Sequence, residues 1–455
     1  MLDRFIKIEK KYNVDDIEYK GDKIWAYLRI IYANAIMKDI ISNYTNSRKK
    51  TFLIKLFNMI KQSFYGFKNW FGSYDYFVIS NTSCRIKIDD KYIDKSFEKI
   101  MEILSYDKVL CLDKGVPFHL PIEQISTKYI VSIDMIYLLT GLFYKLLIFL
   151  KINNRISKLE LLNKKENLSI DYRNNIIKFN IMKNIMKILL RIYRPKVIFI
   201  NCYYSYQSII KAASELNIKT VEVQHGIIGS SHYAYNFYNK VDSSFFPDIL
   251  LTFGDYDKDI ILNNRFNPFK KVIPIGRYSL ELIKDTDIPS ELLNLIQEYK
   301  YSISISTQYT VEDELAIFIK NIALENSDTV FLFSLRHFEK EYYDKFDMPK
   351  NIYLFKGEYS CYDILKACQI HMTSYSTCAL EAEVFLKPTI VVNINKFTSY
   401  YIKDMLYSDN IYNISTETEF DKLKNIKFIN SVNFFYKDNY IENIKKFIDS
   451  NSLKI

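Results

Sequence analysis

The sequence has none of the features typical of a secreted, membrane-spanning or disulfide-rich protein. Its six cysteines are scattered without CxxC spacing, and several lie in apolar runs where a thiol behaves as a small hydrophobe, so we expect them to be reduced. Met1 to Lys11 is charged throughout and lacks an apolar run, so we expect no signal peptide. In the most apolar segment, the uncharged run from Met135 to Tyr144 is well short of the roughly 20 residues of a membrane span. These absences predict a cytoplasmic protein.

Glycine, proline and histidine are also scarce, with 10, 9 and 5 residues among 455. The abundance of Ile, Asn, Lys and Tyr indicates AT-rich coding, so we attach no function to the scarcity of glycine and proline. A hydrophobic share of 49% and a charged share of 25% are ordinary for a globular protein and argue against disorder. The length exceeds what one core usually supports, which favours two domains of roughly 200 residues each.

The formal net charge of +9 favours acidic partners, which include anionic membrane surfaces, nucleotide phosphates and nucleic acids. Basic residues alternate with Phe, Leu, Ile and Trp from Asn46 to Phe71, which fits either a helix lying on an anionic membrane or a surface helix packed on its own domain. Charges interrupt the apolar segment from Tyr129 to Leu150, so we expect a buried or interfacial helix there. No recognised nucleic-acid module occurs, so we expect no nucleic-acid partner.

Short β-branched and apolar runs alternate with helical stretches, which predicts an α/β fold with parallel sheets. A boundary at Asn267 to Lys271 divides the pattern into an N-terminal domain of residues 1–268, which begins with a helical region, and a C-terminal domain of residues 269–455, which ends in a helix. Each half is expected to be a doubly wound Rossmann-like domain. The expected strands are 75–80, 108–113, 197–201, 220–224 and 249–253 in the first domain, and 272–276, 301–307, 329–335, 352–355, 370–373 and 389–393 in the second.

The loop from Val221 to His232, VEVQHGIIGSSH, is the strongest candidate for part of an active site. It follows a predicted strand, and ligands of open α/β sheets bind outside the carboxyl ends of the strands. It holds the two candidate catalytic residues, His225 and His232, and we expect Gln224 and Gly226 to shape the loop. The alternative is a strand-to-helix turn whose histidines only satisfy local hydrogen bonds.

A second polar turn, Ser374 to Thr377, precedes a predicted helix that carries Glu381. Helix amides exposed at this turn would bind a phosphate or diphosphate, and Glu381, about one turn into the helix, would reach a ribose. The alternative is ordinary capping by Ser376 or Thr377, with Glu381 complementing the helix dipole.

Two arginines, a histidine and a threonine follow predicted strands. Arg336 can pair with a phosphate through two hydrogen bonds, and the neighbouring His337 can donate to a leaving oxygen, with a surface salt bridge as the alternative for the pair. Arg277 follows the strand 272–276 and would counter phosphate charge, and Thr307 holds the equivalent position one strand on.

The run STCALEAEVFLKPTIVV, residues 376–392, resembles the donor-binding segment of GT-B glycosyltransferases. The QHG loop and the SLRH run, residues 334–337, similarly resemble bacterial capsule and surface-polysaccharide glycosyltransferases, a group that includes sialyl-, Kdo- and polyol-phosphate transferases. The resemblance covers roughly Arg194 to Asn393. Phe338 stands where the sialyl and polyol-phosphate patterns have the proline of a His-Pro pair, which argues against a cytidine-type donor.

This resemblance implies two Rossmann-like domains facing a central cleft and a glycosyltransferase that needs no metal. The implied partners are a nucleotide-sugar donor and a glycan or lipid-linked acceptor, with peripheral contact at the inner face of the cytoplasmic membrane left open. Asp255 and Asp257 form a DxD spacing, which we interpret as helix capping because of their place after a strand and glycine. His225 would act as the base for the acceptor hydroxyl or bind the donor. The expected donor-binding residues are Arg277, Thr307, Arg336, His337, Ser376, Thr377 and Glu381.

Two other functions remain open at this point. A sugar-nucleotide epimerase shares the architecture, although it needs no membrane-facing acceptor, so the basic amphipathic segment argues against it. A non-catalytic subunit of a polysaccharide assembly machine would keep the same cleft in a degenerate form.

Overall fold

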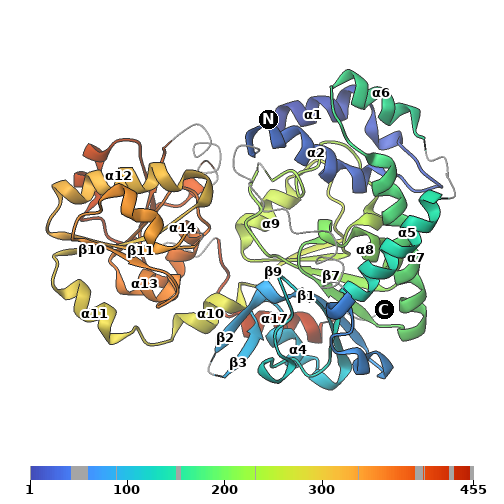
Figure 1. Cartoon of the computed structure of the whole chain (residues 1–455), viewed down its shortest axis with the longest axis horizontal. Coiled ribbons are helices and arrows are strands. Elements are labelled where there is room, and N and C mark those ends of the chain that lie inside the picture. The colour runs from blue at the N-terminus through green and yellow to red at the C-terminus, as the bar shows by residue number, and fades with distance from the viewer. Residues whose placement is uncertain are drawn as a thin grey trace. The chain divides into compact units, whose positions relative to one another are not determined.

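The computed structural model describes residues 2–41, 60–88, 90–149, 155–230, 232–336, 338–394, 403, 405–429 and 435–450. The chain divides into two compact units, Met1–Tyr278 with Asn439–Ile455, and Ser279–Asp438. Each unit is built on one parallel sheet flanked by helices (Figure 1). The predicted α/β class with two Rossmann-like units is therefore confirmed.

The sheet of the first unit has the strand order β5-β4-β1-β6-β7-β8-β9. The chain fills it outward from the middle, because β1 pairs in parallel with β4 on one side and with β6 on the other. The strand order thus reverses between β1 and β6. The strands are β1 (Tyr76–Asn81), β4 (Val109–Lys114), β5 (Ile130–Ser132), β6 (Val197–Ile200), β7 (Lys219–Val223), β8 (Ile249–Thr252) and β9 (Lys271–Pro274).

Both faces of this sheet are buried, since alternate side chains of a strand point to opposite sides. Phe77 and Ile79 of β1 pack into one apolar core, whereas Val78 packs into another. An antiparallel hairpin of β2 (Arg85–Ile88) and β3 (Lys91–Asp94) follows β1. The helices of this unit are α1 (Leu2–Lys11), α2 (Trp25–Ile41), α4 (Glu98–Ile103), α5 (Asp134–Phe149), α6 (Ser157–Lys165), α7 (Tyr172–Tyr193), α8 (Gln207–Ser214), α9 (Asp255–Leu262) and α17 (Tyr440–Asp449).

The sheet of the second unit has the order β12-β11-β10-β13-β14-β15, and it reverses between β10 and β13. Helix α12 covers one face and α13 the other (Figure 1). The strands are β10 (Tyr301–Ser306), β11 (Thr329–Ser334), β12 (Ile352–Phe355), β13 (Ile370–Thr373), β14 (Thr389–Val392) and β15 (Ile411–Ile414). The helices are α10 (Tyr278–Lys284), α11 (Ser290–Gln297), α12 (Glu312–Glu325), α13 (Cys361–Ala367), α14 (Cys378–Glu381) and α16 (Phe420–Leu423).

The boundary between the units lies later than the predicted division at residue 268. The strand that was expected to open the second domain is β9, which pairs with β8 so that Ile273 lies opposite Leu251. It therefore completes the first sheet. The terminal helix α17 also belongs to the first unit, because Tyr440, Ile444 and Phe447 pack into the same core as Val78.

The most apolar segment forms a strand and a surface helix. Ile130–Ser132 is β5, and α5 follows with Ile136 and Thr140 as its buried residues. None of the described helices has the length and apolarity needed to cross a bilayer. Of the basic amphipathic segment, residues 46–59 lie outside the described residues.

A buried ion pair joins the N-terminal helices to the loop that follows β7. Glu9 accepts hydrogen bonds from Trp25 Nε1 at 2.8 Å and from Arg29 Nε at 3.2 Å. The Arg29 guanidinium also donates to the backbone carbonyls of Tyr233 and Asn236. Arg29 and Glu9 are both 1% exposed. The pair thus fixes the loop just beyond His232.

Replacing Arg29 by alanine should lower the free energy of unfolding by about 3–5 kcal/mol, because the Glu9 carboxylate would stay buried without its cation. Chemical denaturation measures the change. Arg4→Ala on α1 is the control, since Arg4 is exposed and its loss should change stability by less than about 0.5 kcal/mol. Equal effects of the two substitutions would show that the buried pair does not anchor the loop.

Candidate functional site

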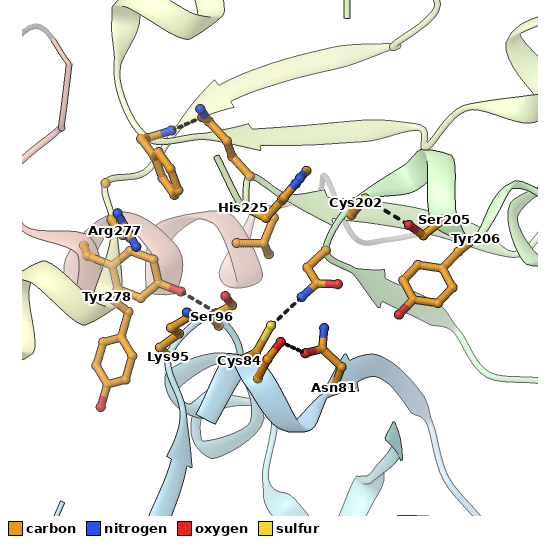
Figure 2. Close-up of a pocket in the computed structure, with 17 residues that line it drawn as sticks. Asn81, Cys84, Lys95, Ser96, Cys202, Ser205, Tyr206, His225, Arg277 and Tyr278 are labelled. Carbon is orange, nitrogen blue, oxygen red and sulfur yellow. Dashed lines mark hydrogen bonds between the residues drawn. The ribbon is translucent and has the colours of Figure 1, made fainter. Parts of the chain in front are cut away.

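A pocket of about 290 Å³ lies in the first unit at the carboxyl ends of β1 and β6, where the strand order reverses (Figure 2). Open α/β sheets bind ligands in the crevice at such a reversal. Asn81 comes from the end of β1 and Asn201 directly follows β6, while Lys95 follows the β2–β3 hairpin. The loop after β7 contributes His225. Arg277 reaches the pocket from beyond β9, so segments far apart in the sequence line it together.

The two cations of the pocket are Lys95 and Arg277, which lie on one side of it in Figure 2. The Arg277 guanidinium lies over the ring of Phe253, and its Cζ is 5.2 Å from the ring centroid. Two positively charged side chains in a pocket that is also lined by polar residues favour the binding of an anionic group such as a phosphate. Arg277 was predicted to act with the second domain, and its place in the first unit corrects that prediction. The physical reason is the pairing of β9 with β8.

The two cysteines of the pocket are not reactive nucleophiles. Burial raises the pKa of both Cys84 and Cys202 to about 11, so both thiols are protonated near neutrality. Asn201 Nδ2 donates to Cys84 Sγ at 3.0 Å, which orients the amide at the pocket floor. The cysteines therefore act as small, weakly polar wall residues.

Gln224 holds the loop after β7 in place. Its side chain is 1% exposed, accepts a hydrogen bond from Phe253 N at 2.6 Å and donates to Gly226 O at 2.8 Å. Gly226 itself lies outside the left-handed region, and a Cβ there would meet nothing within 4 Å. The buried amide of Gln224, more than the glycine, accounts for the shape of this loop.

The two candidate histidines lie on either side of one tyrosine. Tyr204 OH and His225 Nε2 are 3.0 Å apart, and the Tyr204 ring also contacts that of His232. His225 is exposed on one side, and desolvation by the surrounding protein lowers its pKa to about 4. Desolvation, with His225 nearby, likewise lowers the pKa of His232 to about 4. Both rings are neutral at physiological pH, and of the two only His225 lines the pocket.

A buried glutamate supports the pocket from behind. Glu222 of β7 is fully buried, and its Oε1 accepts hydrogen bonds from Cys202 N, Tyr203 N and Tyr235 OH at 3.2, 3.0 and 2.6 Å. Its Oε2 is buried without a hydrogen-bond partner. Burial raises the pKa of Glu222 to about 8. The carboxyl thus orients the turn after β6 that carries Cys202.

Asp255 and Asp257 lie in the first turn of α9, but the N-cap residue is Gly254 and no side chain caps the helix, so the predicted capping does not form. Asp257 Oδ1 accepts a hydrogen bond from Ile228 N at 2.8 Å, and burial raises its pKa to about 7. Asp255 is paired with Lys258 at 3.1 Å. The DxD spacing thus ties helix α9 to the loop that carries His225.

A second buried polar cluster follows β4 and β5. His119 Nδ1 lies 2.9 Å from Asp113 Oδ2, and its Nε2 lies 2.9 Å from Ser132 Oγ and 3.4 Å from Asp134 Oδ2. Burial lowers the pKa of His119, but the two carboxylates outweigh burial and raise it overall. Ser132 is fully buried. The arrangement resembles a catalytic triad in its order of contacts, yet the buried serine gives it a structural character.

In the second unit, Thr307 and Ser376 lie on the loops after β10 and β13, the neighbouring strands between which the strand order reverses. Thr307 follows β10, and its Oγ1 donates to Ser334 O at 3.4 Å and accepts from Arg336 N at 3.4 Å. Ser376 Oγ accepts from Cys378 N at 3.3 Å, the capping contact expected under the alternative interpretation. The Arg336 side chain is exposed. His337 lies outside the described residues.

Glu381 is the centre of this second cluster and is 1% exposed. Tyr362 OH donates to Glu381 Oε2 at 2.8 Å, and Thr377 Oγ1 donates to Oε1 at 3.2 Å. The helix that carries it, α14, ends at Glu381 and continues as a 3₁₀ turn. Hydroxyl groups already satisfy both carboxylate oxygens, so a ligand hydroxyl would replace that of the exposed Thr377.

Several pocket residues were missed in the sequence. Asn81 and Asn201 are single polar residues at the ends of apolar strands, a signal that becomes specific only when the two strands are known to be neighbours. The position of Lys95 at the pocket follows from the hairpin of β2 and β3, which the sequence analysis does not predict. Glu222 lies at a buried position of β7, and a glutamate in a strand sequence does not by itself indicate that its side chain is buried.

No protein-family model matches the chain, and no curated protein matches it by sequence. Solved structures do match it. A proposed UDP-N-acetylglucosamine 2-epimerase of Listeria monocytogenes has a TM-score of 0.51 at 12% identity, over 83% of this chain and 97% of that one. The UDP-GlcNAc 2-epimerase of Methanocaldococcus jannaschii has a TM-score of 0.50 at 12% identity, over 82% and 99%. At such identity the likeness establishes the fold, two Rossmann-like units of the GT-B type.

The buried carboxyl of Glu222 generates a prediction about pH and stability. Its folded pKa of about 8 lies above the ordinary value of 4.5, so the folded state holds the extra proton, and this contribution to stability is lost as pH rises from about 4.5 through 8. We compare the wild type with Glu222→Gln, which has nearly the same shape but cannot ionise. The free energy of unfolding of the wild type should fall relative to that variant by up to about 1.4 kcal/mol per pH unit in this window.

Urea denaturation at pH 5, 6.5 and 8 tests this difference. The surface substitution Glu298→Gln is the control, because Glu298 is exposed and should show no such trend. A constant gap between wild type and Glu222→Gln at all three pH values would mean that the carboxyl is ionised in the folded state.

Proposed function

We propose that this protein is a metal-independent, GT-B-type glycosyltransferase that moves a sugar from a nucleotide-sugar donor to a glycan or lipid-linked acceptor in bacterial surface-polysaccharide biosynthesis. One observation carries the proposal: each parallel sheet has polar or cationic side chains gathered where its strand order reverses. The pocket of the first unit and the polar loops that follow β10 and β13 in the second unit would provide places for two ligands. A transferase needs places for both a donor and an acceptor.

The second unit would take the nucleotide-sugar donor. Glu381 would accept hydrogen bonds from ribose hydroxyls. The exposed Thr377 donates to this carboxylate, and a ribose hydroxyl would replace that hydrogen bond. Arg336 would pair with the diphosphate, because its side chain is exposed beside the end of β11. Thr307 and Ser376 serve as supports in this scheme, as their hydroxyls hold the neighbouring backbone.

The first unit would take the acceptor. Lys95 and Arg277 give its pocket two positive charges, which suit the phosphate of a lipid-linked acceptor. His225 is the candidate base, with Tyr204 holding Nε2 at 3.0 Å. Desolvation keeps the imidazole unprotonated and able to accept a proton, although a pKa of about 4 also weakens its proton affinity. His232 would act on His225 through Tyr204 and not on the acceptor.

A sugar-nucleotide epimerase is the second candidate, favoured by the fold likeness to the two proteins named above. An epimerase converts a nucleotide-sugar without any acceptor. Incubation with a nucleotide-sugar alone therefore separates the two functions: an epimeric nucleotide-sugar as product would replace the transferase proposal.

Donor binding should be selective for one nucleotide class and should depend on Glu381. In a thermal-shift screen of UDP, GDP, CMP, CDP and their sugar conjugates, the matching ligand at about 100 times its Kd should add about 2.7 kcal/mol of stability. Glu381→Ala should abolish the shift relative to its own baseline. Glu325→Ala, at an exposed site in the same unit, should retain it. Absence of a shift with every ligand, in folded protein, would favour a non-catalytic assembly subunit.

His225→Ala should lower kcat by about 10²- to 10⁴-fold if the imidazole is the acceptor's base, while the donor-induced thermal shift stays intact. Tyr204→Phe should have a smaller effect, because it removes only the contact at Nε2. The measurement is the rate of sugar transfer under single-turnover conditions with saturating donor. Full activity of His225→Ala would exclude the catalytic role.

A further inference from the structure

Helix α5 carries an apolar stripe that points away from its own unit. The exposed side chains Leu139, Leu142, Phe143, Leu146 and Phe149, which we call the α5 face, are between 36% and 82% exposed. At 100° per residue they fall within an arc of about 120°. An arc of that width normally faces a protein core, whereas the core-facing residues of α5 are Ile136 and Thr140. The α5 face is therefore a large apolar surface in need of a partner.

A second exposed apolar feature adjoins the start of α5. The side chains of Phe64, Phe67 and Phe71, which we call the aromatic ridge, form a chain of ring contacts at 5.9 and 5.6 Å and are 57%, 42% and 79% exposed. Backbone contacts fix the ridge against β5, because Ser132 N donates to Tyr65 O at 3.0 Å. At Gly66, with φ of 66°, a Cβ would lie 1.9 Å from Ile130 O, so only glycine permits this approach.

The charge on the segments that carry these surfaces is mostly basic, although Asp134 begins α5 and Asp171 caps α7. The sequence from residue 40 to residue 74, which includes the aromatic ridge, contains no Asp or Glu, and neither does the stretch from 135 to 159 that includes the α5 face. Helix α7 packs beside α5 (Figure 1) and has five basic residues and no acid. Three of those five pair with acids from other elements, while Lys178 and Arg191 are exposed.

This charge decides between occupants of the apolar surface. A second copy of the chain would bring two basic surfaces together, which costs free energy. An anionic lipid surface would complement them, since each Lys or Arg near such a surface contributes about 1 kcal/mol. The 16 described residues of α5 are too few to cross a bilayer, because they extend about 24 Å against a hydrocarbon core of about 30 Å.

We propose that the α5 face and the aromatic ridge rest in the interfacial layer of an anionic lipid bilayer, with α5 parallel to the membrane plane. An apolar stripe flanked by Lys and Arg is the pattern of helices that lie at this depth. Lys145 borders the α5 face, and Lys61 and Lys68 lie along the ridge. No residue of this surface lines the pocket of the first unit, so the proposal stands independently of the proposed function.

Vesicle flotation of the full chain tests the proposal. The protein should bind vesicles that contain phosphatidylglycerol and bind pure phosphatidylcholine vesicles more weakly, and raising NaCl from about 0.1 M to 1 M should reduce binding. Leu142→Glu with Leu146→Glu should lower partitioning by about tenfold or more, because both side chains would leave the apolar layer. Lys178→Glu with Arg191→Glu should weaken binding to the anionic vesicles only.

The matched control is Ile317→Glu with Leu324→Glu on α12, where exposed apolar residues lie in the second unit and should not affect binding. Circular dichroism and thermal unfolding establish that each variant is folded. Equal binding by the α5 and α12 variants would overturn the proposal, as would absence of binding to every vesicle. Monomer formation by the α5 variant from a dimeric parent, measured by analytical ultracentrifugation, would assign the surface to a second copy instead. The nucleotide thermal shift should be unchanged in the α5 variant. A negative result in the vesicle experiment would therefore not count against the proposed donor site.

Discussion

The reversal of strand order in each parallel sheet is the constraint on which the candidate sites depend. Parallel strands share one carboxyl edge, and where the order reverses, the loops of two adjacent strands turn in opposite directions and leave a crevice. In the first unit this crevice lies between β1 and β6, with Asn81 and Asn201 at its floor. In the second unit the order reverses between β10 and β13, and Thr307 directly follows β10. The same topology thus explains two sites built from unrelated residues.

Buried polar groups hold the loops of the first crevice in position. Gln224 donates to the carbonyl of Gly226, and Asp257 accepts from the amide of Ile228. Glu222 accepts from backbone amides of the turn after β6. Each of these groups is almost fully removed from water, so each hydrogen bond is strong and its loss is costly. Arg29 extends this support to the N-terminal helices through two backbone carbonyls. The exposed imidazole of His225 therefore stands on a rigid buried frame.

The surface helix α5 begins directly after a buried stretch of chain. Ser132 and Asp134, which contact His119 in the buried cluster, are also the last residue of β5 and the first of α5. The same strand receives the aromatic ridge through Tyr65 and Gly66. One buried cluster thus fixes the position of both exposed apolar features, so that they are presented by a rigid part of the first unit.

The sequence by itself determined the α/β class, most strands of both sheets and the place of the loop after β7, because runs such as VIFI and the turn residues after them are local signals. It also predicted that Thr307 and Ser376 follow strands and that Glu381 lies in a helix. Tertiary structure decided the rest. Only the pairing of β9 with β8 places Arg277 in the first unit, since strand order is a long-range property that no local pattern encodes. Burial of Glu222 and exposure of the α5 face likewise follow from packing, because an amphipathic pattern does not state which side meets the core.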